Sequence, residues 1–182
     1  DSQSITVTVN AVNDAPVATV GLSGSTNEDQ SVVVNLSGSD IDGDNLTFTL
    51  DTDAASGSVV IDGTIATYTP TSNFNGDDSF SFTVSDGELT DTAEVSLTIE
   101  AVNDAPVLAT VSDVSFDEDS SGSTSLSGSD IDGDDLTYSI SGGSDITATL
   151  SGSDVSFSAP ANFNGSETFT VSVSDTDLTD SQ

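Results

Sequence analysis

Two short acidic segments carry the residue types that bind metal ions. Residues 40–44 and 130–134 both read DIDGD, so three carboxylates are interspersed with an isoleucine and a glycine. Ca²⁺ takes six to eight oxygen ligands, and carboxylates separated by one residue converge on one ion where a glycine lets the chain bend. Each segment is a candidate calcium site. The candidate ligands are Asp40, Asp42 and Asp44 in the first copy and Asp130, Asp132 and Asp134 in the second.

The DIDGD segments also resemble the first half of an EF-hand loop, which binds calcium between two helices. Their glycine comes one step too early for an intact EF-hand, and neither flank has a helical pattern. The EF-hand interpretation is rejected on these grounds. A solvated acidic turn without metal remains the alternative, because charged residues usually lie on the surface.

Other oxygen-bearing residues recur in the same order around each DIDGD copy. An Asn-Asp pair precedes the first expected strand of each repeat, an acidic cluster precedes the second strand, and a Ser-Asp pair follows the sixth. This recurrence favours metal binding over a solvated turn. The residues concerned are Asn13, Asp14, Glu28, Asp29 and Asp86 in the first repeat, and Asn103, Asp104, Glu118, Asp119 and Asp175 in the second.

The charge of the chain requires cations from outside. It has 32 Asp and Glu residues and no Lys, Arg or His, which gives a formal net charge of −32. Phosphate contacts need Lys and Arg, so nucleic acid is excluded as a partner, and an anionic membrane surface would repel the chain. The chain also has no cysteine and hence no disulfides, so bound metal is the obvious source of rigidity.

The chain is a tandem repeat. SDIDGD begins at residues 39 and 129, AVNDAPV begins at 11 and 101, and NFNG begins at 73 and 162. Such regular spacing marks stacked structural units. We expect residues 1–12 to be the final strand of a preceding repeat, 13–102 to form the first complete repeat, and 103–182 to form a second that lacks its last strand.

Alternation of apolar residues with Ser and Thr predicts strands bounded by Gly, Asn and Asp. Seven strands per repeat is the spacing of a β-sandwich, so we expect an all-β fold class, with seven-stranded Greek-key sandwiches stacked end to end. The strands are expected near 15–20, 31–36, 46–50, 57–61, 64–69, 79–85 and 92–100, and near 106–111, 123–127, 136–140, 145–150, 153–158 and 167–174.

Strand direction decides which loops share an end of the sandwich. The loops after the first and fifth strands fall at one end, and the loops after the second and sixth strands fall at the other, with the incoming linker. The junction of the repeats should then collect many carboxylates, which repel one another unless cations lie between them. The expected set is Glu28, Asp29, Asp77 and Asp78 with Asn103, Asp104, Asp130, Asp132 and Asp134; Ser166-Glu167 stands where the first repeat has Asp77-Asp78.

Residues 1–12 and the end of the second repeat are complementary in pattern. Ile5-Thr-Val-Thr-Val9 matches Val95-Ser-Leu-Thr-Ile99, which is the last expected strand of the first repeat. An unpaired edge invites strand addition, so residues 1–10 either fray or complete the second repeat of a neighbouring chain, head to tail. A boundary without biological meaning is the alternative.

Together, AVNDAPV, SDIDGDNLTF and NFNGDDSFSFTVSDG resemble the cadherin-like tandem repeats of large bacterial surface adhesins, including those of RTX type. The resemblance implies immunoglobulin-like extender modules whose junctions bind Ca²⁺. It further implies a stiff extracellular stalk that holds a distal binding domain away from the bacterial cell. By the same resemblance, Asn13, Asp14, Asn103, Asp104 and the DIDGD aspartates are calcium ligands.

An enzyme and a ligand-binding module are the alternatives to the extender. Without His, Cys, Lys or Arg, the chain lacks the usual nucleophile–base pairs, and its acidic residues lie in polar loops rather than in an apolar cleft, so no enzymatic activity is expected. A carbohydrate- or ice-binding module is the remaining alternative. Thr6, Thr8, Thr47 and Thr49 alternate along strands, but this is ordinary composition for a solvent-facing sheet.

Overall fold

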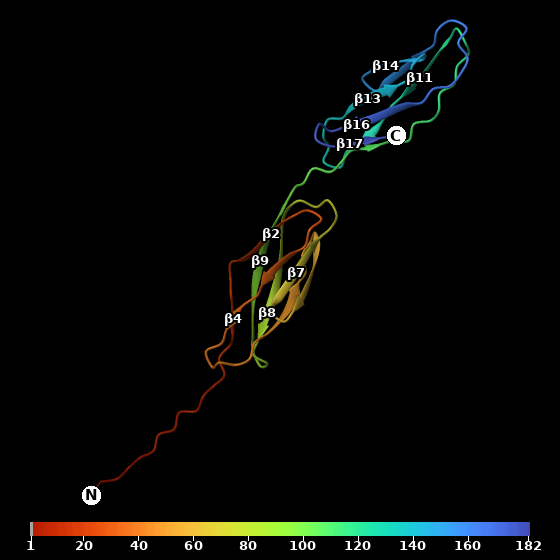
Figure 1. The fold of residues 1–182 in the computed structure, drawn as a ribbon. Coiled ribbons are helices and arrows are strands. Elements are labelled where there is room, and N and C mark those ends of the chain that lie inside the picture. The colour runs from red at the N-terminus through yellow and green to blue at the C-terminus, as the bar shows by residue number, and fades with distance from the viewer. Residues whose placement is uncertain (1) are drawn as a thin grey trace. The chain divides into compact units, whose positions relative to one another are not determined.

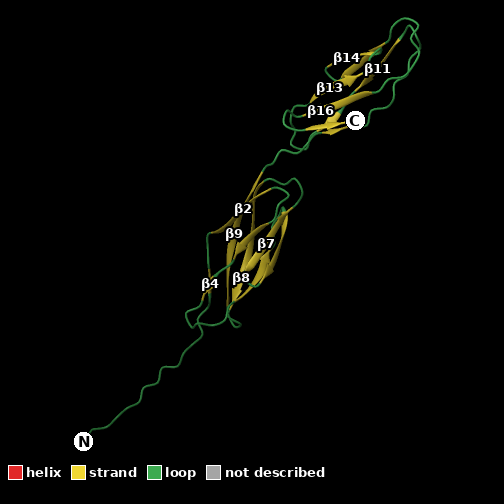
Figure 2. Cartoon of the chain, viewed as in Figure 1, coloured by secondary structure: helices red, strands yellow, loops and turns green. Residues whose placement is uncertain are grey.

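The computed structural model describes residues 2–182. In this part of the chain, all regular secondary structure consists of β-strands (Figures 1 and 2). The chain divides into two compact units, Asp1–Val102 and Asn103–Gln182. The all-β fold class predicted from the sequence is confirmed. No helix in the described residues is long and apolar enough to cross a membrane.

Unit one is a sandwich of two main sheets. One sheet has the order β2-β9-β8-β5 and the other β3-β7-β6, while the short strands β1 and β4 pair with each other. All pairs are antiparallel except β2 with β9. The strands are β1 (Val17–Ala18), β2 (Leu22–Asn27), β3 (Val32–Asn35), β4 (Gly38–Ser39), β5 (Thr47–Thr52), β6 (Gly57–Asp62), β7 (Ile65–Pro70), β8 (Gly76–Ser85) and β9 (Thr90–Glu100).

The core of unit one follows from period-2 alternation. Side chains of a strand point alternately to the two faces of its sheet, so Val95, Leu97 and Ile99 on β9 face inward and are at most 3% exposed. Phe82 on β8 is fully buried, with its ring centroid 6.2 Å from that of Phe48. Each such apolar side chain contributes roughly 1.5–3 kcal/mol when it leaves water.

Unit two repeats this topology with fewer strands. Its sheets are β13-β16-β17 and β11-β15-β14, with β10 paired to β12. The strands are β10 (Val107–Leu108), β11 (Ser121–Ser125), β12 (Gly128–Ser129), β13 (Thr137–Gly142), β14 (Thr147–Ser151), β15 (Asp154–Ser158), β16 (Phe169–Ser174) and β17 (Thr179–Ser181).

The first strand of unit one differs from the prediction. In place of one strand over 15–20, the chain forms β1, which pairs with β4, and then β2, which pairs with β9, with Gly21 at φ 76° between them. β2 runs parallel to β9, from the Leu22–Val95 pair to the Asn27–Glu100 pair. Its sequence LSGSTN has only one large apolar residue, so alternation did not reveal it.

The prediction that unit two lacks its last strand is wrong for the first three residues. β17 pairs with β16 over Ser172–Ser174, and Val171 exchanges two backbone hydrogen bonds of 3.0 Å with Gln182. β17 occupies the place in unit two that the start of β9 occupies in unit one. Residues 2–10, expected to be strand, form no strand among the described residues.

Candidate metal sites

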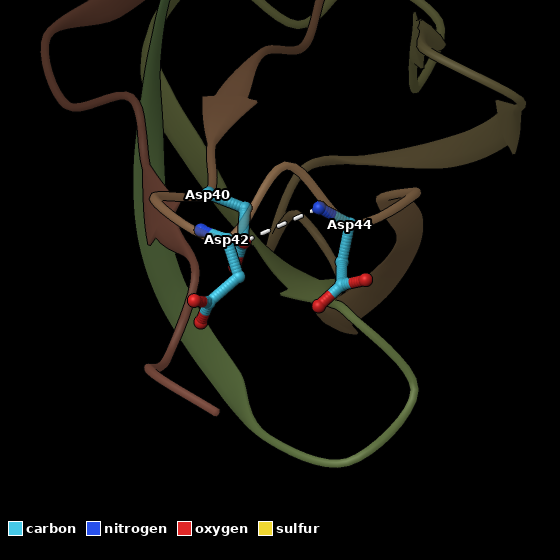
Figure 3. A group of neighbouring side chains, drawn as sticks. All are labelled: Asp40, Asp42 and Asp44. Carbon is cyan, nitrogen blue, oxygen red and sulfur yellow. Dashed lines mark hydrogen bonds between the residues drawn. The ribbon is translucent and has the colours of Figure 1, made fainter. Parts of the chain in front are cut away.

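The DIDGD loop of unit one is organised by its first aspartate. Asp40 Oδ1 accepts backbone hydrogen bonds from Asp42 at 2.8 Å, Gly43 at 3.0 Å and Asp44 at 3.3 Å (Figure 3). Gly43 adopts φ 83°, a conformation that glycine permits without strain. The loop is thus a closed turn, and the carboxylates of Asp42 and Asp44 extend from the same side of it.

Unit two builds the same turn independently. Asp130 Oδ1 accepts from Asp132 at 2.9 Å, Gly133 at 3.1 Å and Asp134 at 3.4 Å, and Gly133 has φ 81°. In both copies, one carboxylate oxygen from each of the three aspartates lies within 4.8 Å of the others. The two sequence-predicted triads are therefore each brought together by the fold.

A buried oxygen in each triad tests whether a cation fits. Asp40 Oδ2 and Asp130 Oδ2 are buried and have no hydrogen-bond partner. An anionic oxygen in this state is costly, and neighbouring carboxylates make it worse. Because carboxylate and carbonyl oxygens are the ligands that Ca²⁺ prefers, the residues present fit a calcium ion.

The incoming segment of each unit is tied to the same loop. The backbone N–H of Asp14 donates to Asp42 Oδ2 at 2.8 Å, and Asn13 Nδ2 donates to Asp86 Oδ2 at 2.9 Å. Asp86 also accepts the backbone N–H of Leu89 at 2.7 Å. Unit two repeats these bonds through Asp104 and Asp132 at 2.8 Å, Asn103 and Asp175 at 2.9 Å, and Leu178 and Asp175 at 2.6 Å.

Two aspartates in unit two have pKa values that move in opposite directions. Backbone N–H groups, led by that of Leu178, lower the pKa of Asp175 and keep it charged. Partial desolvation and the carboxylates around Asp134 raise its pKa. A cation would relieve that repulsion. Asp177, which contributes to it, was missed by the sequence analysis because it lies outside the DIDGD and Ser-Asp motifs.

Glu28 lies at the opposite end of unit one. It is 4% exposed, its Oε1 accepts the backbone N–H of Val102 at 2.5 Å, and its buried Oε2 has no partner. Asp29 adopts φ 58°, and its Oδ1 accepts the backbone N–H of Asn73 at 3.2 Å. The turn that carries Glu28 and Asp29 therefore contacts both Val102 and Asn73 within unit one, while the collection of carboxylates predicted for the junction of the repeats stays a prediction.

Unit two keeps only part of this second cluster. Asp119 adopts φ 64° and accepts the backbone N–H of Asn162 at 3.0 Å, as Asp29 does for Asn73. Glu118, the counterpart of Glu28, is exposed. The metal role of Glu28, Asp29, Glu118 and Asp119 stays a prediction.

Asp78 has a role that was not predicted. Its carboxylate accepts the backbone N–H groups of Ala55 at 3.1 Å and Ser56 at 2.9 Å and the hydroxyl of Tyr68 at 3.0 Å. Burial alone would raise the pKa of Asp78, but these donors outweigh it and lower the pKa. Burial and the Asp78 carboxylate raise the pKa of Tyr68. Asp78 therefore anchors the loop between β5 and β6.

Glu167 takes the place of Asp78 in unit two. It accepts the hydroxyl of Ser144 at 2.7 Å and the backbone N–H groups of Ser144 and Ile146 at 2.9 Å. These donors, the Ser144 side chain foremost, lower the pKa of Glu167 to about 2. Asp77 lies exposed on β8 and accepts from Thr98 Oγ1 at 3.3 Å. Calcium binding by Asp77, Asp78 and Glu167 stays a prediction.

The comparisons with known proteins agree with this fold. The family described as bacterial Ig domain matches residues 13–98 and again residues 103–182. No protein with a curated description matches the chain.

Several solved structures are similar to the chain. Human protocadherin-24 EC1-2 has a TM-score of 0.51 and 16% identity over 89% of this chain and 87% of that one. PcdhgB3 EC1-4 has a TM-score of 0.53 and 12% identity over 92% and 47%. The endo-fucoidan hydrolase MfFcnA4 from glycoside hydrolase family 107 has a TM-score of 0.43 and 22% identity, and the chain spans 27% of its length. The first two of these likenesses show a shared fold and nothing further.

Proposed function

Because the chain belongs to the bacterial Ig domain family, we propose that it is a calcium-stiffened extender module of a bacterial surface adhesin. In this function the units have no catalytic task. They add length between the cell and a distal binding domain. Calcium ions bound in the acidic loops hold each linker to its neighbouring units.

The observation that carries the proposal is the repeated tie between linker and metal loop. Asp104, in the segment that joins the units, donates its backbone N–H to Asp132. Two residues earlier, Val102 donates to Glu28 of unit one. Asp132 belongs to a triad with an unpartnered buried oxygen, and Glu28 has such an oxygen itself. Ions at these positions would restrain the linker.

The expected energies suit an extracellular setting. Extracellular modules bind Ca²⁺ with dissociation constants of about 0.1–1 mM. Several millimolar Ca²⁺ then adds about 1–2 kcal/mol per site. Summed over the two triads, this is a substantial share of the stability of a small domain.

Calcium should raise the melting temperature of the chain selectively. We expect a saturable rise over the value in excess EDTA, and a much smaller one with Mg²⁺. Asp44→Asn and Asp134→Asn should each reduce the rise while leaving the melting temperature in EDTA unchanged or higher, because a repelling charge is removed. Asp62→Asn, at the exposed end of β6, is the matched control.

Stiffening needs a second measurement on the same proteins. With one spin label in each unit, Ca²⁺ should narrow the distribution of distances between the labels. The Asp134→Asn variant should need more Ca²⁺ for the same narrowing. If Ca²⁺ raised the melting temperature but left the distribution of label distances unchanged, the two sandwiches would bind metal without being stiffened by it. That result would refute the extender mechanism.

Carbohydrate or ice binding is less well supported. Thr47 and Thr49 lie exposed on β5, whereas Thr6 and Thr8 lie outside any strand. The four threonines therefore do not form one flat face, which that function would require.

A further inference from the structure

β2 and β9 form the parallel strand pair of unit one, whose other strand pairs are antiparallel. Their pairing covers all six residues of β2 without a shift of register. It continues beyond β2, where the backbone N–H of Glu28 donates to the carbonyl of Glu100 at 2.9 Å. The N–H of Val102 then donates to the Glu28 carboxylate at 2.5 Å and closes the pair at its far end.

The chain enters and leaves unit one at opposite ends of β9. Asn13 of the entering segment donates to Asp86, which lies just before β9 begins at Thr90. The outgoing chain continues from Glu100, at the other end of this 11-residue strand (Figure 1). The two ends of β9 are roughly 35 Å apart. The chain continues on both sides of unit one, so tension along the chain pulls the entry and the exit apart along the direction of β9.

Such tension acts on β2 and β9 in opposite directions along their common axis. β2 is pulled at its first residue, Leu22, toward the entry, and β9 is pulled at its last residue, Glu100, toward the exit. Because the strands are parallel, their hydrogen bonds are stretched together and must break together. We propose that the β2–β9 pair is a shear clamp that enables unit one to withstand tension along the chain. This inference rests on the proposed function only in that an extender is pulled along its length.

The neighbouring pairings make β2 the element that sets the resistance. On its other side, β9 is paired to β8 over all ten residues of β8, so β9 is the better anchored of the two strands. β1, which the tension reaches first, pairs with β4 over only two residues, and its Ala18 N–H donates to Asp91 Oδ2 at 2.8 Å. The six-residue pairing of β2 is stronger than the first hold and weaker than the β8–β9 pairing, so its rupture should open the unit.

The sequence of β2 fits a role in backbone pairing. LSGSTN has one large apolar residue, and its inward positions are only partly buried, so β2 adds little to the core. The Glu28 N–H points toward β9. Because N–H groups alternate between the two sides of a strand, those of Gly24 and Thr26 also point toward β9, whereas that of Ser25 points away from it. Thr26 and Ser25 therefore offer neighbouring positions with opposite roles in the clamp.

The test is the lifetime of unit one at constant force, measured on single molecules in EDTA. The chain has no cysteine, so it can be held at introduced ones. Val12→Cys with Ala101→Cys shears the clamp. Asn75→Cys with Ala101→Cys holds the end where Gly76 pairs with Ile99, and so peels β8 from β9 one bond at a time.

At the same force, the unit should last much longer in the shearing arrangement than in the peeling one. Each further bond that must break at the same moment should lengthen the lifetime roughly fivefold. Both arrangements use the same folded unit, so overall stability does not account for the difference. Equal lifetimes would overturn the proposal.

Proline variants assign the resistance to β2. Thr26→Pro removes an N–H that faces β9 and should shorten the lifetime under shear roughly fivefold or more. Ser25→Pro is the matched control and should shorten it much less. Thr26→Val controls for loss of the bond from Thr26 Oγ1 to the Gln30 carbonyl at 3.2 Å. If Ser25→Pro and Thr26→Pro had the same effect, β2 would not be the clamp. If Thr26→Pro fails to fold, the comparison of the two pulling arrangements decides alone.

Calcium separates this inference from the proposed function. The paired strands contain no residue of the aspartate triads, so the long lifetime under shear should already be present in EDTA. A difference between the two arrangements that appears only in Ca²⁺ would show that bound ions resist the force, and it would refute the clamp. If the difference holds in EDTA but Ca²⁺ does not narrow the distribution of label distances, the extender mechanism fails and the clamp stands.

Discussion

At the scale of single residues, Asp40 and Asp130 do two tasks with one carboxylate. Oδ1 of each holds three backbone N–H groups and so shapes the loop, while the buried Oδ2 stays without a protein donor. A turn organised this way holds its oxygens in place before any ion arrives. Less ordering is then needed on binding, which favours affinity.

This part of the site was predictable because it is local. The spacing Asp-x-Asp-Gly-Asp contains the turn, its glycine and its candidate ligands within five residues. The role of Asp78 was not predictable, since its donors on Ala55 and Ser56 lie more than 20 residues away. An isolated acidic pair in the sequence does not show whether its oxygens face an ion or a loop.

Thr176 carries backbone strain that unit one avoids. Its φ of 97° is unfavourable for a β-branched residue, and unit one has Gly87 at φ 104° in the same turn. Strain of this kind costs about 1–3 kcal/mol, and a glycine at this position would remove it. Glycine also loses more backbone entropy on folding, which costs roughly 0.5–1 kcal/mol. Thr176→Gly should therefore stabilise unit two by about 1 kcal/mol, a rise of roughly 4–8 °C in melting temperature by calorimetry.

The reverse change in unit one is the control. A Cβ at Gly87 would meet no atom within 4 Å, so Gly87→Thr adds no clash and should destabilise unit one through the backbone alone. Equal melting temperatures for the unaltered chain and the Thr176→Gly variant would show that the turn relaxes at no cost.

At the scale of elements, the two units exchange large and small residues across the sandwich. In unit one, a Cβ on Gly24 of β2 would come within 2.9 Å of Val34 Cγ2. In unit two, a Cβ on Gly122 of β11 would come within 2.7 Å of Val114 and Phe116 side-chain atoms. In unit one the large side chains are on β3, and in unit two they are on the segment before β11.

This exchange explains how well the strands were predicted. Most strands were found because large residues alternate along them, as on β8 and β9. β2 was missed because the large side chains that fill the space beside it belong to β3. β11 was placed two residues late because its sequence SGSTS has little apolar content. The volume of a strand is set jointly with its neighbour, which a single segment of sequence does not reveal.

The loop between β13 and β14 should make the stability of unit two depend on pH. The Glu167 that anchors it has a folded-state pKa of about 2, against an ordinary value of 4.5. A lowered folded-state pKa means that the contribution to stability is complete above the ordinary value and is lost as pH falls from about 4.5 toward 2. Unfolding of unit two in EDTA should show this loss.

Glu167→Gln isolates the effect from the many other carboxylates, Asp145 in the same loop included. The variant should be less stable at neutral pH, and the difference from the unaltered chain should shrink steadily through that window. If the difference in free energy of unfolding stayed constant down to about pH 2, the hydrogen bonds from Ser144 and Ile146 would be equally strong to a charged and to a neutral side chain at position 167, which contradicts this prediction.

At the scale of the whole chain, every ionisable side chain that is charged at neutral pH is negative. The 32 acidic side chains face no Lys, Arg or His, so long-range electrostatics among side chains is purely repulsive. Repulsion is stronger in the compact state than in the unfolded one, and it destabilises the fold. Any cation, bound or diffuse, should therefore stabilise this protein.

Simple salt should raise the melting temperature in EDTA, because there are no attractive side-chain ion pairs for salt to weaken. Raising NaCl from about 0.01 M to 0.1 M shortens the screening length from about 30 Å to 10 Å, so most of the gain should come in that range. The same salt should diminish the extra gain from Ca²⁺, since both act on the same repulsion. Near about pH 2.5, where most carboxylates are neutral, the response to NaCl should largely disappear. A fall in melting temperature with NaCl at neutral pH would show instead that attraction between carboxylates and backbone N–H groups outweighs the repulsion of the whole chain.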